Sequence, residues 1–336
     1  MKKTIFIPVI IIVALIGLGL FYWLGLEKFF PKEKEEEKVY KVAVVLIGGA
    51  YNEALDGMID GLSKMGYIRE KNIIFYIKDT QGDYEAVGPA TEELLKENPD
   101  LFYVISTPAT TRVWKVVGDR LPIVFNIVGD PIGAGFAKSF ASSETNLTGC
   151  SNLSAGLSGK RLEIFKEAFP HLKKLVTFYD PDNKFSQISI ANTRETLSKV
   201  GVEVDEVYVK TVDDIKKALA AIKPGQYDGI HLTPDAMVIA RVELIVDKAK
   251  ELRIPVMGHE ATLAEKGVTV TYGANFYELG VQCAPIVHYV LKGQAPQNIP
   301  IQAPKELEMV VNLKTAQEAG LTIPAETLAK ANRVIR

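Results

Sequence analysis

The sequence predicts an α/β protein with two lobes, each built on a doubly wound parallel sheet. After residue 38, apolar runs rich in β-branched residues alternate repeatedly with amphipathic stretches. Continuous apolar strands that alternate with helices are typical of parallel sheets covered by helices on both faces. The length of 336 residues suggests two domains, since a domain usually has roughly 150 residues.

The N-terminal segment is apolar enough to cross a membrane. Residues 4–26 contain no charge and are rich in Ile, Val, Leu and Phe, and a helix of this length spans about 35 Å. Lys2 and Lys3 precede it, which predicts a cytoplasmic N-terminus and an extracytoplasmic remainder. We expect a transmembrane helix, with residues 1–28 as membrane anchor or signal segment. A cleaved signal peptide, giving a secreted or periplasmic protein, is the second choice.

A charged, low-complexity run separates this segment from the folded part. Residues 31–38 read PKEKEEEK, a composition that cannot bury itself. We therefore expect a solvated tether over residues 29–38.

The remaining elements are expected in alternating order. Strands are predicted at 40–47, 72–78, 101–106, 123–127, 174–179, 203–209, 229–232, 255–257 and 267–272. Helices are predicted between them at 53–65, 84–96, 160–169, 186–200, 212–222 and 236–251.

The domain boundary follows from a pause in this alternation. Residues 146–154 form a small, polar stretch, after which a second set of strands and helices begins. A long helix near 276–292 and a late strand at 308–312 suggest that the chain crosses between lobes more than once. We expect lobe 1 to contain 39–150 plus 275–310, and lobe 2 to contain 151–274 plus 311–336.

Composition and motifs argue against several function classes. Lys+Arg 39 against Asp+Glu 41 gives a net charge of -2, which disfavours nucleic-acid binding. Cys150, Cys283 and four histidines lack metal-site spacing, so no metal is expected. The GxSxG, GxxxxGK[ST] and GxGxxG motifs are absent. We therefore expect no enzyme activity and no cofactor.

Polar and aromatic residues recur just after the predicted strands. In this architecture such positions converge on a cleft at the carboxyl ends of the strands. Capping of the following helices is the alternative for each single residue, whereas convergence from both lobes favours a small polar ligand. The candidate ligand-binding residues are Tyr51, Asn52, Thr107, Thr110, Asp130, Tyr179, Phe185, Ser186, Asp235, Glu260, Tyr272 and Asn275.

Four of these candidates predict an apolar, aromatic group on the ligand. Tyr51, Tyr179, Phe185 and Tyr272 fall at or beside strand ends, where flat rings can sandwich another ring. The alternative is that some of the rings close the interlobe core or lie at the hinge.

Several segments resemble a known family. Residues 105–110 (ISTPAT), 128–135 (VGDPIGAG), 146–149 (NLTG), 273–280 (GANFYELG) and 320–324 (GLTIP) are similar to stretches of ABC transporter substrate-binding proteins of the tryptophan/tyrosine-binding type. The resemblance extends from about residue 39 to 335. It implies the type I periplasmic-binding fold, with three crossovers and a ligand enclosed between the lobes.

The resemblance also implies roles for individual residues. Thr107 and its loop would meet a ligand carboxylate, Asp130 would shape the hinge side, and Asp235 would face an ammonium. Tyr179 and Ser186 would line the pocket. The sequence departs from the family pattern at 143–146, at 180–182, and at Ala236 and Met237.

These observations lead to one expected function. The protein is expected to be the extracytoplasmic solute-binding component of an ABC importer. It would be a monomer that captures a small amino-acid-like ligand, aromatic or apolar, by domain closure and serves ABC permease subunits. A ligand-sensing ectodomain of a signalling system and a binding protein for a sugar or nucleoside are the alternatives.

Overall fold

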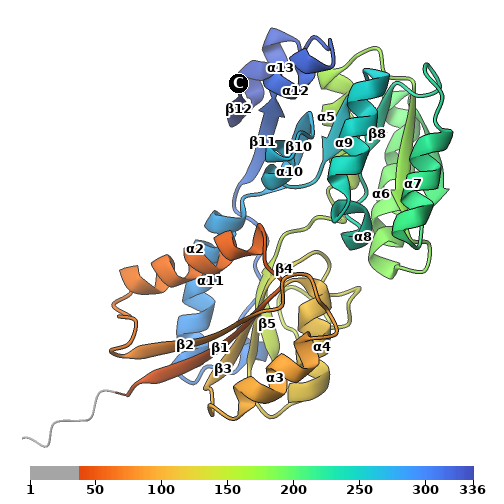
Figure 1. The fold of residues 1–336 in the computed structure, drawn as a ribbon. Helices are drawn as coiled ribbons and strands as arrows, with labels where there is room; N and C mark the ends of the chain where they lie inside the picture. Colours follow the sequence, from red (N-terminus) through yellow and green to blue (C-terminus); the bar gives the residue numbers. More distant parts are fainter. Residues whose placement is uncertain (1–37) are drawn as a thin grey trace, which may run out of the picture. The chain divides into compact units, whose positions relative to one another are not determined.

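The computed structural model describes residues 38–336, and residues 39–336 form one compact unit. This unit contains two sheets with helices on both faces of each (Figure 1), which confirms the predicted α/β class. The predicted anchor at 1–28 lies outside the described residues, as does the tether apart from Lys38. Among the helices of residues 38–336, none is long and apolar enough to cross a membrane.

The first sheet is parallel and has the strand order β2-β1-β3-β4-β5. Helices α2 and α11 cover one face, and α3 and α4 cover the other. We call this sheet and its helices the first lobe. Its strands are β1 (Tyr40–Leu46), β2 (Ile73–Asp79), β3 (Leu101–Ile105), β4 (Ile123–Val128) and β5 (Leu147–Ser151). Its helices are α2 (Tyr51–Lys64), α3 (Val87–Leu95), α4 (Thr107–Val117) and α11 (Phe276–Leu291), with the 3-10 turn η2 (Pro296–Asn298).

The second sheet has the order β12-β11-β10-β9-β8-β6-β7. Helices α5 and α6 lie over one face, and α7 and α9 over the other. This is the second lobe. Its strands are β6 (Lys174–Tyr179), β7 (Glu203–Tyr208), β8 (Gly229–His231), β9 (Val256–Gly258), β10 (Val270–Ala274), β11 (Leu307–Asn312) and β12 (Arg333–Ile335). Its helices are α5 (Ser158–Ala168), α6 (Lys184–Val200), α7 (Val212–Ala221), α8 (Ala236–Ile239), α9 (Val242–Leu252), α10 (Ala261–Glu265), α12 (Leu313–Glu318) and α13 (Ala325–Lys330).

Two features of the sheets differ from the prediction. Residues 146–154, where the predicted alternation of strands and helices pauses, contain β5, which pairs with β4 as the fifth strand of the first sheet. The second sheet is not purely parallel, because β11 runs antiparallel to β10, from Ala274 opposite Leu307 to Val270 opposite Val311. The reason is that the chain leaves this sheet at the end of β10 and re-enters it from the same side.

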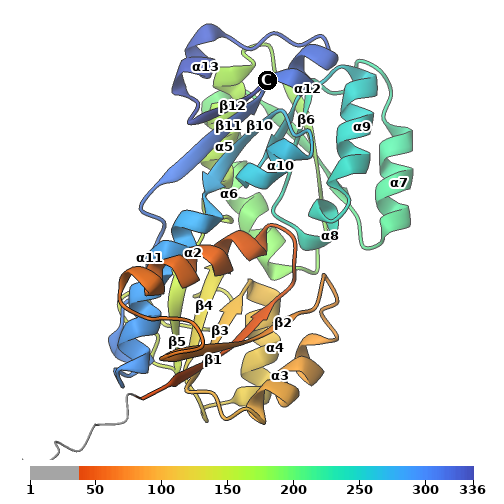
Figure 2. The same ribbon diagram turned by 60° about the vertical axis from the view of Figure 1, so that its left-hand side comes forward.

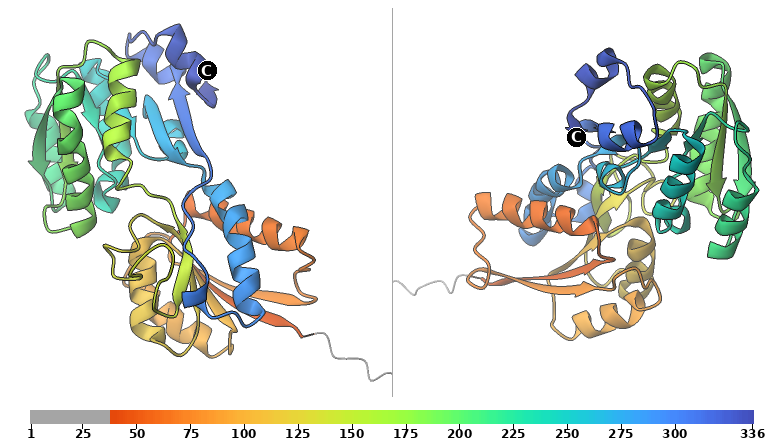
Figure 3. Two further views of the ribbon diagram at one scale, coloured as in Figure 1. Left: turned by 180° about the vertical axis from the view of Figure 1, so that it is seen from behind. Right: turned by 45° about the horizontal axis from the view of Figure 1, so that its top comes forward.

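The chain crosses between the lobes in three places, after β5, after β10 and before β11. The crossing after β5 and the crossing before β11 lie side by side, and Ser151 N–H at the start of the first donates to the Gln302 carbonyl of the other at 2.9 Å. Figures 2 and 3 show this region from other sides. The last crossing is complete by Leu307, so the predicted boundary at residue 310 falls inside β11.

Helices α2 and α11 approach each other unusually closely. A Cβ atom at Gly57 would lie 2.0 Å from the Tyr277 carbonyl oxygen, and one at Gly280 would lie 2.2 Å from the Ala54 carbonyl oxygen. Only glycine permits this backbone contact. It fixes α2, whose first residue, Tyr51, belongs to the candidate site.

Candidate ligand-binding cleft

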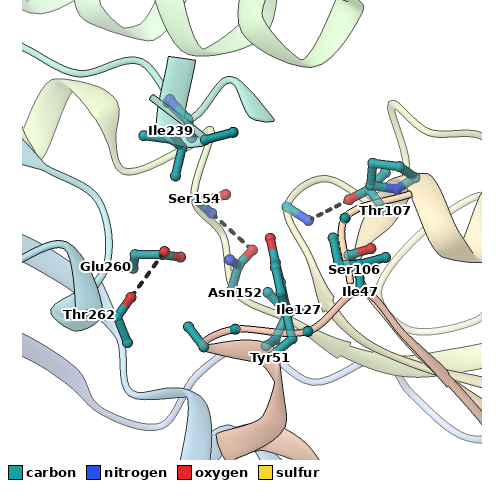
Figure 4. Close-up of a pocket in the computed structure, with 18 of the residues that line it drawn as sticks. Ile47, Tyr51, Ser106, Thr107, Ile127, Asn152, Ser154, Ile239, Glu260 and Thr262 are labelled. Atoms are coloured by element: carbon teal, nitrogen blue, oxygen red, sulfur yellow. Dashed lines mark hydrogen bonds between the residues drawn. The ribbon is translucent and has the colours of Figure 1, made fainter. Parts of the chain in front are cut away.

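A cavity of about 1140 Å³ lies at the carboxyl ends of strands from both sheets (Figure 4). Loops after β1, β2, β3 and β4 line it from the first lobe, the crossing after β5 contributes Asn152 and Ser154, and loops after β6, β8 and β9 line it from the second lobe. Pockets for small molecules usually have about 300–1,000 Å³. The cleft therefore has room for an amino-acid-sized ligand with space left over.

The loop between β1 and α2 places an aromatic ring on the first wall. Gly48 and Gly49 have φ of +76° and +62°, a conformation that glycine adopts without steric cost. After this turn the Tyr51 ring stacks on Phe276, with centroids 5.8 Å apart and planes 19° apart. Burial is the largest cause of the raised pKa of Tyr51, and the charge of Glu260 and the neighbouring Tyr84 raise it further. The hydroxyl therefore stays protonated, and it points into the cavity in Figure 4.

The N-terminus of α4 forms another part of this wall. Ser106 adopts φ 104° and caps the helix by accepting a hydrogen bond from Ala109 N–H at 3.3 Å. Thr107 Oγ1 accepts from Gly129 N–H at 3.2 Å, which joins the ends of β3 and β4. A helix N-terminus carries partial positive charge and suits an anion such as a carboxylate.

The backbone on the first wall is also strained near the end of β4. Ile127 has φ 53°, a genuine outlier for a β-branched residue. The Asn126 side chain holds it by accepting from Ile127 N–H at 2.8 Å, and Asn126 Nδ2 donates to the Tyr103 hydroxyl at 2.7 Å. Such strain persists where the surroundings fix it, often at ligand sites.

Asp235 lines the second wall, but its carboxylate is already occupied. Oδ2 accepts from the Ser186 hydroxyl at 2.7 Å and from Asp180 N–H at 3.2 Å. Oδ1 accepts from Met237 N–H at 3.0 Å and from Val238 N–H at 3.3 Å. A carboxylate has about four acceptor sites. The Asp235 side chain therefore caps α8 and links that helix to α6 through Ser186.

Glu260 is the carboxylate on this wall with acceptor capacity to spare. It is 9% exposed, and Oε1 accepts from the Thr262 hydroxyl at 3.1 Å. Oε2 lies 3.7 Å from His259 Nε2; burial lowers the pKa of His259 well below its usual value, so this imidazole is neutral. Burial also raises the pKa of Glu260 to about 7, against opposing effects of Thr262, Lys266 and Arg161. Figure 4 shows Glu260 directed into the cavity.

Phe185 joins the two walls. A Cβ atom at Gly129 would lie 2.2 Å from the Phe185 ring atoms Cε2 and Cζ. Phe185 belongs to α6 of the second lobe, whereas Gly129 follows β4 of the first. Glycine at 129 therefore allows the ring to lie directly on the first wall.

The structure brings half of the predicted site residues to the cavity. The residues that line it are Tyr51, Asn52, Thr107, Phe185, Asp235 and Glu260. Their direct contact with a ligand stays a prediction.

The other six candidates lie outside the lining because they serve the folded framework. Tyr179 donates its hydroxyl hydrogen bond to Glu206 at 2.7 Å, and Tyr272 packs in the core beneath α5. The remaining four hold local backbone or side chains. They are Thr110 (bonded to the Ser106 carbonyl), Asp130 (to Ile132 and Gly133 N–H), Ser186 (to Asp235) and Asn275 (to Glu278 N–H and Glu308).

Several lining residues that carry polar or aromatic groups were not among the candidates, and three of them lie at or near strand ends. Asp79, Tyr84 and His259 all line the cavity. Asp79 and Tyr84 surround the turn after β2, and His259 directly follows β9. Their position at the end of a strand or in the loop that follows it was a usable signal, the same one that identified Glu260.

We expect Asp235→Ala to act mainly on stability. Loss of the cap should lower the free energy of unfolding by about 0.5–2 kcal/mol, with ligand affinity nearly unchanged. Asp235→Asn, which keeps one acceptor oxygen, should lose less. Thermal melting and calorimetric titration of both variants check this. A large loss of affinity at unchanged stability would instead assign Asp235 to the ligand ammonium.

The fold and the cleft together define a class. Two α/β lobes joined by three crossings, with a cavity at the carboxyl ends of both sheets, form a type I periplasmic-binding-like fold. The model of the family "ABC transporter substrate binding protein" matches residues 39–335. The chain therefore belongs to this family, as the sequence segments predicted. Its members are extracytoplasmic solute-binding proteins, a non-enzymatic class.

Individual relatives agree with this assignment. A conserved domain protein from Vibrio cholerae has a crystal structure with TM-score 0.81 and 30% identity, covering 88% of this chain and 100% of that chain. An ABC domain from Streptococcus pneumoniae in complex with L-Trp has TM-score 0.80 and 24% identity, covering 89% and 100%. A tyrosine-binding protein of Clostridioides difficile is 24% identical over 283 residues, 84% of this chain and 81% of that protein.

Proposed function

We propose that this protein is the solute-binding component of an ABC importer and captures a small amino-acid-like ligand with an aromatic or apolar side chain. The observation that carries the proposal is the chemistry of the cleft. Glu260 offers a carboxylate to an ammonium, and the N-terminus of α4 can receive a carboxylate. The rings of Tyr51, Tyr84 and Phe185 offer apolar faces for the side chain.

Two relatives support the choice of ligand class. The Streptococcus pneumoniae protein was crystallised with L-Trp, and the Clostridioides difficile relative is a tyrosine-binding protein. Both have two-thirds or more of their length matched by this chain.

Binding proceeds by closure of the lobes in this proposal. The three crossings form a hinge, and a ligand that contacts both walls stabilises the closed state by the additional contacts made there. The closed complex then delivers the ligand to permease subunits. The protein works as a monomer held at the extracytoplasmic face by residues 4–26, with cleavage and release as the second possibility.

A thermal-shift screen of the purified protein against amino acids, nucleosides and sugars tests the ligand class. A ligand at a hundredfold excess over Kd adds about 2.7 kcal/mol to the free energy of unfolding. We expect the largest shifts with Trp, Tyr and Phe, and smaller ones with Ser and Glu. A strong shift with a sugar or nucleoside, and none with amino acids, would reject the proposal. Reconstitution with the permease would separate an importer from a signalling ectodomain.

A further inference from the structure

The charged residues of the cleft lining are predominantly acidic. Five carboxylates line it, and Lys266 is the single Lys or Arg among the described residues of the lining. Lys266 pairs with Glu243 at 3.2 Å, and one of the acids, Glu265, pairs with Arg333 at 2.9 Å. The carboxylates of the lining for which residues 38–336 provide no Lys or Arg ion pair are Glu53, Asp79, Asp235 and Glu260.

These carboxylates come from both lobes and repel one another across the cavity. Glu53 and Asp79 belong to the first wall, and Asp235 and Glu260 to the second. Partial burial raises the pKa of Glu53, and the charge of Glu265 on the opposite wall raises it further, against the opposing charge of Arg333. The pKa of Tyr84 is likewise raised, mainly by burial and to a small extent by Asp235 across the cleft, while the larger effect of the Arg112 charge lowers it. Bringing the walls together without a cation therefore costs electrostatic free energy.

A second observation points to a missing ligand group at the same wall. His259 lines the cavity, is 8% exposed, and its Nδ1 atom has no hydrogen-bond partner among the described residues. Its neighbour Glu260 is equally buried, and Thr262 satisfies one of its oxygens. Buried polar atoms normally have partners. The hydrogen bonding of His259 and Glu260 in this corner of the cavity is therefore incomplete until a ligand or water supplies the missing partners.

We propose that the cleft selects its ligand for net positive charge, so that a primary amine without a carboxylate binds more tightly than the amino acid with the same side chain, with Glu260 receiving the ammonium. This inference rests on the proposed function and specifies its substrate class. An ammonium neutralises the repulsion between the walls, and the faces of Tyr51 and Phe185 attract it as well. The carboxylate of an amino acid meets the N-terminus of α4 but no Lys or Arg of the described lining that lacks an acidic partner, whereas Glu53, Asp79 and Glu260 have no Lys or Arg partner. Asp235 contributes less, because four hydrogen bonds already satisfy its carboxylate.

Calorimetric titration at pH 8 with three indole compounds tests the proposal. The probes are tryptamine, L-tryptophan and indole-3-propionate, which share the ring and differ in charge. We expect tryptamine to bind about tenfold or more tighter than L-tryptophan, and indole-3-propionate to bind most weakly. The advantage of tryptamine should shrink as salt rises from 50 to 500 mM, because salt screens the exposed carboxylates.

Variants on the first wall separate this electrostatic effect from shape. Glu53→Gln and Asp79→Asn remove exposed charges and should each reduce the ratio of tryptamine to L-tryptophan affinity by several-fold. Glu203→Gln is the matched control, since Glu203 is an exposed acid of β7 outside the lining, and should leave the ratio unchanged.

The outcomes distinguish the two proposals. If L-tryptophan binds and tryptamine does not, the ligand carboxylate is required; the selection for positive charge is then wrong, while the amino-acid-binding function stands. If none of the three indole compounds binds and a sugar or nucleoside does, both proposals fail. Equal ratios in the wild type and in the Glu53 and Asp79 variants would also overturn the electrostatic inference.

Discussion

Replacing Glu260 by glutamine should weaken the binding of an ammonium-bearing ligand at pH 8 by about 2–5 kcal/mol, the usual cost of removing one partner of a buried charge pair. The substitution preserves the size of the side chain and an acceptor for the Thr262 hydroxyl, so shape changes little. Calorimetric titration with the ligand identified by the thermal-shift screen measures the loss. The Glu203→Gln protein is the control, because that residue is exposed and is not part of the cleft lining.

The same substitution should stabilise the ligand-free protein at pH 8. The pKa of Glu260 is raised by burial from 4.5 to about 7. A group with a raised pKa contributes stability below its unfolded value, and this contribution is lost as the pH rises through its folded value. The difference corresponds to about 3 kcal/mol, so Glu260→Gln should gain up to that amount at pH 8 and nothing near pH 4. Urea unfolding at both pH values checks the sign.

Ligand affinity should depend on pH for the same reason. The groups that act on Glu260 are Thr262, Lys266, Arg161 and Glu53, in addition to the neutral His259 nearby. Because an ammonium needs the ionised carboxylate, affinity should be highest near pH 8 and fall about tenfold per pH unit well below 7. The Glu260→Gln protein should lack this dependence. A wild-type affinity that stays constant between pH 5 and 8 would exclude Glu260 as the ammonium partner.

The sequence was sufficient for the fold class because periodicity is a local signal. Strands such as β1 and β3 are continuous apolar runs, and the alternation with helices implies parallel sheets. Strand β5 escaped prediction because four of its five residues, TGCS after Leu147, are small and form no apolar run, although all five are buried. The direction of β11 escaped it because that depends on where the chain re-enters the second sheet, which no local pattern encodes.

The candidate site was only half predictable, since helix caps and ligand contacts use the same residue types in the same places. Asn275 and Glu260 both follow a strand and precede a helix. In the structure Asn275 accepts the hydrogen bond from Glu278 N–H as a cap, whereas Glu260 makes no cap hydrogen bond and is directed into the cavity. The difference arises from tertiary placement. The role of an aromatic ring is equally hard to predict from its place in the sequence. Tyr179 follows the same pattern as the cleft residues, but its partners Glu206 and Tyr208 come from the neighbouring strand β7.

Gly280→Ala should lower the free energy of unfolding by about 1–3 kcal/mol or more, the usual cost of overpacking. The added methyl group would lie 2.2 Å from the Ala54 carbonyl oxygen and 2.9 Å from Met58 N. Both are backbone atoms of α2, so no side chain can rotate away and the helices must separate. Alanine normally favours a helix over glycine, which makes a loss of stability here diagnostic of the close contact.

Gly88→Ala provides the matched control for this prediction. Gly88 lies in α3, and nothing comes within 4 Å of a Cβ atom built there. The substitution should be neutral or stabilise by about 0.4–1 kcal/mol through the unfolded chain. Denaturant unfolding compares the two variants, and equal stability of both would contradict the close packing of α2 on α11. Since α2 begins at Tyr51, separation of these helices should also displace that ring from Phe276 and weaken ligand binding, an effect that Gly88→Ala should not produce.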